Sequence, residues 1–216
     1  MRQKFIVIFL FFAGLFANAQ SPEVLKAKEI LDKVAAKTKS YQTISADFAF
    51  TLENKQAEII DTHIGNIIIK GNKYKIDLMD VDTYFDGTTI WMYLRDAGEV
   101  NVSEPDMTDD ETLNPATVFT IYEEGFKYIH AGETTLNGKK ADIIDLFPEK
   151  RDKPFSRIKL YIYRDNLQIG KITQIGKDGN NYIIDIKKMD VNKPAEDSLF
   201  TFDASKHPGV DIIDMR

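Results

Sequence analysis

The sequence predicts an α+β fold in which a long antiparallel meander of strands curls into a barrel or half-barrel and carries two helices. Three observations predict it: an amphipathic segment near the N-terminus, later runs in which polar and apolar residues alternate, and tight-turn dipeptides between those runs. Strands joined by short turns pair in sequence order, and long meanders bend until they close or form a half-barrel. No internal repeat or linker divides the sequence, so we expect one domain after an N-terminal leader.

The first predicted element is a helix over residues 22–39. Ser21 can cap its N-terminus, and Pro22 suits the first helical position, where a backbone N–H is not needed. Apolar side chains recur at helical spacing on one face, and the charged side chains lie elsewhere. The residues of this face are Val24, Ala27, Leu31, Val34 and Thr38.

Alternating runs continue through most of the remaining sequence. In each run the apolar residues point to one face and the polar residues to the other, which is typical of half-buried antiparallel strands. The dipeptides Asp86-Gly87, Asn137-Gly138 and Asp178-Gly179 favour tight turns between such strands. The apolar positions of the clearest runs are Phe48, Phe50 and Leu52; Tyr74, Ile76 and Leu78; Ile158, Leu160 and Ile162; and Tyr182, Ile184 and Ile186.

A polar stretch followed by a short apolar helix interrupts the strands. Residues 101–113 are polar and acidic and predict a loop, and residues 147–156 predict a second one. Asn114-Pro115 can begin a short helix over residues 116–124, which Gly125 ends. The apolar side chains of this helix surround much of its circumference, so they need burial on more than one side. The mouth of a half-closed barrel offers such burial, and we expect the helix to cover it as a lid.

Residues 1–19 have the layout of a secretory signal peptide. Arg2 and Lys4 precede an apolar run, and Ala17 and Ala19 place small residues before a cleavage point at Gln20. The apolar run is short for a membrane-spanning helix, so a retained anchor is the less favoured alternative. Cleavage would leave residues 20–216 as a single domain of a size common for barrels.

Composition restricts the classes of partner. The sequence has no cysteine, so we expect neither lipidation at the leader nor disulfides in the exported protein. Its net charge is −6, and removal of Arg2 and Lys4 with the leader would make it −8. An acidic protein is repelled by nucleic acids and by anionic membranes, so we expect neither as a partner.

Several short segments match one protein family in order. They are Ser45-Ala46-Asp47-Phe48, Gly65-Asn66-Ile67-Ile68-Ile69-Lys70, Asp86-Gly87-Thr88-Thr89-Ile90-Trp91-Met92-Tyr93, Asn114-Pro115, Phe200-Thr201-Phe202 and Pro208-Gly209-Val210-Asp211-Ile212-Ile213. With the N-terminal helix, this ordered set resembles the outer-membrane lipoprotein carrier family (LolA-like). The third segment is close to the family's pattern DGkxlWxY. The resemblance covers essentially the whole mature chain and depends on the order of the segments, because no single segment is specific.

The resemblance implies a strongly curved antiparallel sheet, an incomplete half-open barrel, with the N-terminal helix and the lid helix covering it. It implies a periplasmic carrier whose apolar hollow holds the acyl chains of lipoproteins. The cargo would come from an ATP-driven releasing complex at the inner membrane and pass to a receptor at the outer membrane. Such a carrier is expected to be a monomer without cofactor, metal or catalytic residue.

Two groups of residues are candidates for the acyl-chain site. Ile90 and Met92 compete with Trp91 and Tyr93 for the inward face of their strand. Each candidate could also be ordinary core, because such side chains are usually buried. The candidates for the lining are Phe48, Phe50, Ile67, Ile69, Tyr74, Ile76, Tyr84, Trp91 and Tyr93; those for the lid are Val118, Phe119, Ile121 and Tyr122.

The family resemblance also implies a tether for the lid. Family members often carry an arginine just after the strand that corresponds to residues 67–70, and this arginine holds the lid closed. Here Lys70 is the candidate. A lysine can donate to a lid carbonyl, but it lacks the planar fork of arginine.

Other functions have less support in the sequence. The three histidines, His63, His130 and His207, share no ligand spacing, and no nucleophile motif or phosphate-binding loop is present. A lipid hydrolase is therefore disfavoured. Three alternatives stay open: a lipid-sensing envelope regulator on the same half-barrel, a carrier of another hydrophobic lipid, and a β-protein with a solid core and no ligand.

Overall fold

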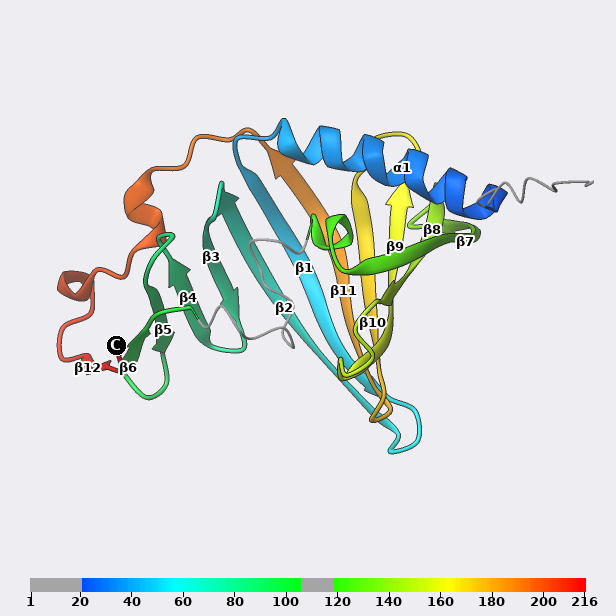
Figure 1. Ribbon diagram of the computed structural model, residues 1–216. Coiled ribbons are helices and arrows are strands. Elements are labelled where there is room, and N and C mark those ends of the chain that lie inside the picture. The colour runs from blue at the N-terminus through cyan, green and yellow to red at the C-terminus, as the bar shows by residue number, and fades with distance from the viewer. Residues whose placement is uncertain (1–20, 106–118) are drawn as a thin grey trace, which may run out of the picture.

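The computed structural model describes residues 21–105 and 119–216, so the predicted signal peptide and Val118 of the predicted lid lie outside the described residues. One α-helix, α1 (Pro22–Lys39), and a twelve-stranded sheet make up most of the described chain (Figure 1). In chain order the strands are β1 (Ile44–Asn54), β2 (Ile59–Lys70), β3 (Lys73–Leu78), β4 (Val81–Phe85), β5 (Ile90–Leu94), β6 (Glu99–Ser103), β7 (Phe126–Leu136), β8 (Lys139–Pro148), β9 (Phe155–Tyr163), β10 (Ile169–Gly176), β11 (Asn180–Val191) and β12 (Asp211–Asp214).

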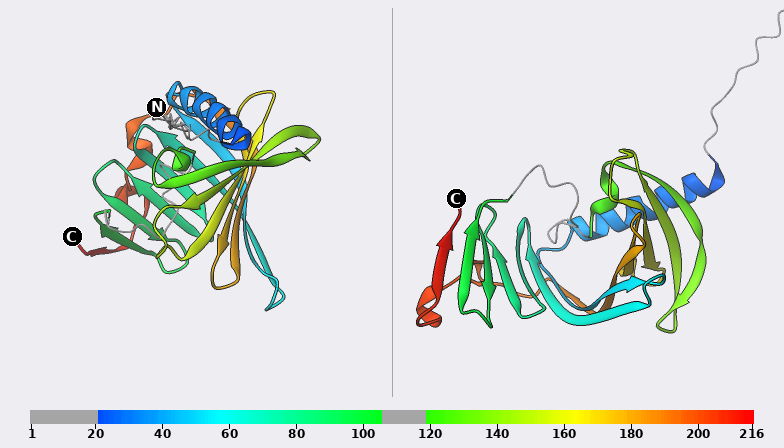
Figure 2. Two further views of the ribbon diagram at one scale, coloured as in Figure 1. Left: turned by 45° about the vertical axis from the view of Figure 1, so that its right-hand side comes forward. Right: turned by 90° about the horizontal axis from the view of Figure 1, so that it is seen from below.

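The sheet is open and strongly curved. Its order is β12-β6-β5-β4-β3-β2-β1-β11-β10-β9-β8-β7, so two meanders, β1 to β6 and β7 to β11, join where β1 pairs with β11. All pairs are antiparallel except β12 with β6. The two end strands do not meet, and α1 lies against the concave side (Figure 2). The predicted incomplete barrel of α+β class is confirmed.

The local signals in the sequence form the elements they predict. The helix α1 begins and ends as predicted; the Ser21 Oγ accepts a hydrogen bond from the Val24 N–H at 3.4 Å. Asn137 and Gly138, with φ of 50° and 76°, make the left-handed turn between β7 and β8. Because asparagine and glycine tolerate positive φ, this turn matches the right-handed twist of its strands.

Three predicted boundaries were wrong. Residues 101–103 belong to β6 rather than to a loop, because Val102 is buried opposite Trp91 of β5. The second predicted loop is shorter than residues 147–156, since β8 ends at Pro148 and β9 begins at Phe155. The described part of the lid is a single 3-10 turn, η1 (Ile121–Glu123), rather than an α-helix to residue 124. Glu124 is extended and Gly125 has a φ of 76°, which ends the turn.

The core lies between the concave side of the sheet, α1 and η1. Ala27, Leu31 and Val34 of α1 are buried there together with Phe119 and Tyr122. The sheet contributes a large apolar set from its central strands and β8–β10. These sheet residues include Ile44, Phe48, Ile67, Ile144, Leu146, Ile158, Leu160, Ile162 and Ile172.

The C-terminal residues 192–210 run over the opposite, convex side. Two 3-10 turns, η2 (Asp197–Phe200) and η3 (Ala204–Lys206), interrupt this segment before β12. Phe200 is fully buried, and the Phe202 ring contacts the rings of Tyr84 and Tyr93 at centroid distances of 5.9 and 5.3 Å. We call residues 192–210 the C-terminal strap.

Candidate functional site

The concave face of the sheet is the candidate functional site, and the strand register defines it. Ile44, Ile69, Tyr74, Phe85 and Ile90 are successive cross-strand partners on β1 to β5. Directly opposed residues of antiparallel strands point to the same side. An unbroken apolar row therefore crosses five strands on the concave face. The Tyr74 and Phe85 rings contact each other along it, with centroids 5.3 Å apart.

Six of the nine predicted lining residues lie on this face. Phe48, Ile67, Ile69 and Tyr74 are buried in the core, and Phe50 and Ile76 are half-buried beside it. Their part in ligand binding stays a prediction. Their common placement follows from the alternation of side chains along β1, β2 and β3.

The placement of Tyr84, Trp91 and Tyr93 on the same face was wrong. Tyr84 and Trp91 are cross-strand partners on the convex face, one position out of step with the row that contains Phe85 and Ile90. They and Tyr93 lie on the side covered by the C-terminal strap, and the His207 ring lies 4.5 Å from the Tyr93 ring. In β5 it is the competing pair, Ile90 and Met92, that points to the concave side.

Gly65 shapes the centre of the concave face. It is the cross-strand partner of Phe48. A Cβ atom at Gly65 would stand 2.7 Å from Phe48 Cζ and 2.7 Å from the carbonyl oxygen of Asp77. Only glycine lets the Phe48 ring lie over β2 at this distance.

The concave face is closed at one end and accessible at the other. Near α1 and β8–β10 its side chains are buried almost completely. Toward β3, β4 and β5 they keep part of their apolar surface exposed, and Met92 is 43% exposed. These partly exposed side chains are Ile76, Leu78, Val81, Phe85, Ile90 and Met92. An apolar surface thus continues from the core to the solvent, as a site for an apolar ligand requires.

The turn η1 covers part of this face next to α1 (Figure 1). Phe119 and Tyr122 are buried in the core, and Ile121 is half-buried against it. Burial raises the pKa of the Tyr122 phenol. The Glu123 carboxylate pairs with the Lys39 ammonium of α1 at 2.9 Å, a contact that no sequence pattern indicates.

Lys70, the predicted lid tether, binds elsewhere. Its Nζ donates to the Ala195 carbonyl and to Asp197 Oδ1, both at 2.7 Å. Lys73 reaches the other oxygen of Asp197 at 2.9 Å. Because Lys70 alternates with Ile69, its side chain points to the convex side. Among the described residues, therefore, Lys70 fastens the C-terminal strap rather than η1.

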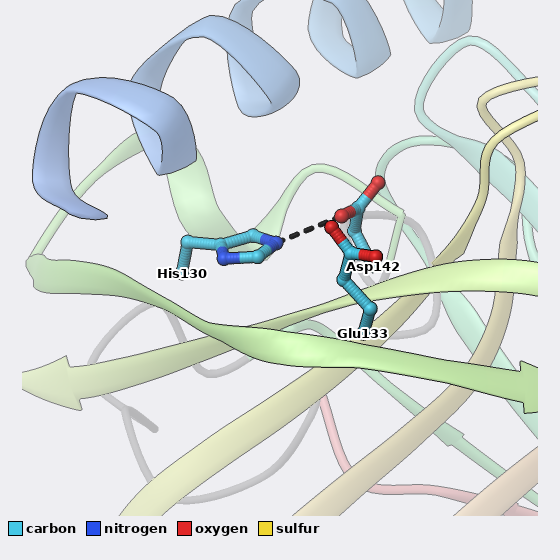
Figure 3. A group of neighbouring side chains, drawn as sticks. All are labelled: His130, Glu133 and Asp142. Atoms are coloured by element: carbon cyan, nitrogen blue, oxygen red, sulfur yellow. Dashed lines mark hydrogen bonds and ion pairs between the residues drawn. The ribbon is translucent and has the colours of Figure 1, made fainter. Parts of the chain in front are cut away.

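An ionic cluster whose buried centre is the pair His130–Asp142 joins α1 to the sheet at the closed end. The bulge at His130–Gly132 in β7 brings His130 and Glu133, three positions apart, to the same side beside Asp142 of β8 (Figure 3). His130 Nε2 and Asp142 Oδ1 are 2.8 Å apart, and Lys26 of α1 pairs with Glu133 at 3.1 Å. Arg164 contacts both carboxylates and donates to both oxygens of Asp142.

This cluster has ligand types suited to a metal ion, since His130, Glu133 and Asp142 hold their ligand atoms within 4.8 Å of one another. Lys26 and Arg164, however, already supply the positive charge. Burial alone would raise the pKa of Asp142, but Arg164 and His130 hold it below its usual value. With these ion pairs the cluster clamps α1 to the sheet.

Comparisons with known proteins agree with this architecture. Residues 15–141, more than half of the chain, match the family model described as "Outer membrane lipoprotein carrier protein LolA". No curated protein matches the sequence. Among residues 21–105 and 119–216, no helix has the length and apolarity needed to cross a membrane.

Solved structures align with the chain at low sequence identity, and those with TM-scores above 0.5 share its fold. An uncharacterized conserved protein from Thermus thermophilus aligns with a TM-score of 0.57 and 12% identity over 88% of this chain and 99% of that one. A DUF1329 family protein from Desulfovibrio piger aligns with a TM-score of 0.51 and 12% identity, covering 87% and 100%. The LolA superfamily protein NE2245 from Nitrosomonas europaea aligns with a TM-score of 0.45 and 11% identity, covering 82% and 97%.

Proposed function

The chain belongs to the LolA outer-membrane lipoprotein carrier family, and we therefore propose that it is a periplasmic carrier that binds the acyl chains of lipoproteins on the concave face of its sheet. The observation that carries this proposal is the apolar surface that runs without a break from the core to the partly exposed side chains of β3–β5.

The energetics of acyl chains set what such a carrier needs. Each methylene removed from water contributes roughly 0.8 kcal/mol, so one chain of about sixteen carbons resists transfer into water by roughly 12 kcal/mol. Two or three chains resist it by tens of kcal/mol on the same estimate. A carrier must therefore replace the bilayer with a comparable apolar surface, and it needs no catalytic group to do so.

The cover over the concave face is held by contacts that an acyl chain can replace. Phe119 and Tyr122 contribute apolar contacts, and the exposed pair Lys39–Glu123 contributes little because water screens it. Acyl chains would take over the apolar contacts of the turn, so loading would open the cover at a small net cost. The same exchange of contacts would assist release, because η1 regains its apolar contacts with the sheet when the acyl chains leave.

The location and partners are proposed by analogy with the family. We propose that residues 1–19 are cleaved as a signal peptide and that residues 20–216 work as a monomeric domain in the periplasm. The cargo would be received from an ATP-driven releasing complex at the inner membrane and delivered to an outer-membrane receptor.

A titration with a fluorescent acyl probe tests the site. The variant Ile76→Asp places a charge on the half-buried part of the concave face and should weaken probe binding at least tenfold. The matched control is Ile64→Asp, which places the same charge on the convex face, where Ile64 is 71% exposed. Equal affinities of both variants and the wild type would overturn the proposed site.

Mass spectrometry of the protein purified from the periplasm tests the cargo. Co-purified acylated protein supports the lipoprotein carrier. A co-purified free lipid without protein would instead support a carrier or sensor of another lipid on the same half-barrel.

A further inference from the structure

Gln174 is a buried polar side chain on the otherwise apolar concave face. It lies on β10 and is the cross-strand partner of Ile158 on β9 and of Tyr182 on β11. Ile158 belongs to the core and is opposed in turn by Leu146 of β8. The register therefore points the Gln174 side chain to the concave side, in the buried part of the face that we propose for acyl chains.

The carbonyl oxygen of the Gln174 carboxamide has no compensation for its burial. The residue is only 7% exposed, and its Oε1 atom has no hydrogen-bond partner among the described residues. A buried acceptor without a donor is costly, and nearly all such groups in native proteins are paired. Leucine or methionine would fill the same volume of an apolar core without that cost. Packing alone therefore gives no reason for a glutamine at this position.

We propose that Gln174 is the polar anchor of the ligand site, and that Oε1 accepts a hydrogen bond from an N–H or O–H group next to the acyl chain of the ligand. This inference rests on the proposed function and deepens it, because it names the ligand class. Amide-linked acyl groups and acyl lipids with a free hydroxyl carry such a donor, whereas fully esterified acyl groups do not. Apolar contacts would supply most of the affinity. The single hydrogen bond would fix how deeply the acyl chain enters the site and which linkage next to the chain is preferred.

Probe binding to the wild type and to Gln174→Met tests the proposal, since methionine is similar in shape and has no strong acceptor. Four probes with the same fluorescent acyl chain differ only in the linkage: secondary amide, N-methyl amide, ester and primary alcohol. In the wild type we expect the secondary amide or the alcohol to bind about fivefold more tightly than its donor-free counterpart, as one buried hydrogen bond provides. A preference for the amide alone indicates an amide-linked cargo, and a preference for the alcohol alone indicates a hydroxylated lipid.

In Gln174→Met this preference should disappear while the affinity for the ester is kept. The control variant is Ile172→Met, two residues earlier on the same strand and face, which should keep the wild-type preference. We also expect Gln174→Met to unfold at a higher temperature than the wild type, because it removes the unpaired acceptor.

The possible failures are distinguishable. If the wild type binds none of the four probes, the proposed function fails with the anchor. If it binds all four and Gln174→Met keeps the same ratio of amide to ester affinity, only the anchor is overturned. A Gln174→Met variant that is less stable than the wild type and equally selective would show a structural role for this glutamine.

Discussion

The ring of Phe48 lies over Gly65 on the neighbouring strand, so closely that the first atom of any side chain at Gly65 would stand 2.7 Å from Phe48 Cζ. The contact joins the two longest strands of the first meander at the centre of the concave face. A Cβ atom at Gly65 could not avoid the Phe48 ring by shifting the other way, because the Asp77 carbonyl oxygen would also stand 2.7 Å from it.

Gly65→Ala should therefore destabilise the protein. Forcing an extra methyl group into a packed site typically costs about 1–3 kcal/mol, and here the backbone of β3 or the Phe48 ring must move. Urea unfolding followed by circular dichroism measures the loss. The adjacent Ile64→Ala, on the exposed convex side, should change the free energy of unfolding much less. A Gly65→Ala protein as stable as the wild type would show that the contact has room to relax.

Removal of the Asp142 carboxylate should loosen α1. Asp142→Asn removes the anion that Arg164, Lys26 and His130 share. Because Arg164 and Lys26 are partly exposed and keep Glu133 as a partner, we expect a loss of about 1–3 kcal/mol. Thermal unfolding checks the loss of stability. Zinc should not raise the unfolding temperature of the wild type, and a clear rise would instead identify the cluster as a metal centre.

The C-terminal strap should loosen in acid around Asp197, while the buried Phe200 keeps it on the sheet. Lys70 and Lys73 lower the pKa of the Asp197 carboxyl to about 2. A carboxyl whose pKa is lowered on folding stabilises the folded state above its ordinary pKa near 4 and loses this contribution as the pH falls toward 2. The single tryptophan, Trp91, lies on the convex face beside Tyr84 and reports the local change by fluorescence.

The matched variant for this acid transition is Asp197→Asn. It should show the tryptophan change already at neutral pH and lose the part of the pH dependence between about 4 and 2. Identical acid titrations of wild type and variant would mean that the two lysines do not hold the strap.

The sequence predicted the parts of the fold that local chemistry determines. The cap at Ser21, the turn at Asn137-Gly138 and the strands β1 and β3 each depend on neighbouring residues, and each of these elements is confirmed. The strand of residues 90–94 is apolar on both sides, so alternation could not determine which side faces inward. Phe202, more than a hundred residues later, decides it by covering Tyr93.

The residues that the sequence did not indicate are those with distant partners. Lys70 was assigned to the lid, but its partner Asp197 comes from the far end of the chain. Lys39 and Glu123 carried no signal, since an exposed lysine and glutamate have many equivalent partners. Gln174 did carry a weak signal: it falls on the apolar side of the alternating run that begins at Ile172.

The pair Lys39–Glu123 should make a small contribution to keeping η1 closed. Glu123→Lys replaces the attraction with repulsion, and hydrogen exchange of residues 119–125 should become faster while the global stability changes by less than about 1 kcal/mol. The double variant Lys39→Glu with Glu123→Lys restores the pair and should restore slow exchange. If exchange stays fast in the double variant, the faster opening comes from the substitution at residue 123 itself and not from loss of the ion pair.

The two faces of β5 should respond to substitution in opposite ways. Met92 points to the concave side and is already 43% exposed, so Met92→Lys should leave stability nearly unchanged. Its charge must lose water when an acyl chain covers the face, and the affinity for an acyl probe should fall about tenfold or more. Tyr93→Leu removes the ring contacts with Phe202 and His207 on the other side and should loosen the C-terminal strap, seen as faster hydrogen exchange of residues 197–207, with probe affinity unchanged. The reverse pattern, weak binding by Tyr93→Leu and full binding by Met92→Lys, would move the acyl site to the convex face, because only substitutions on the side that touches the ligand change its affinity.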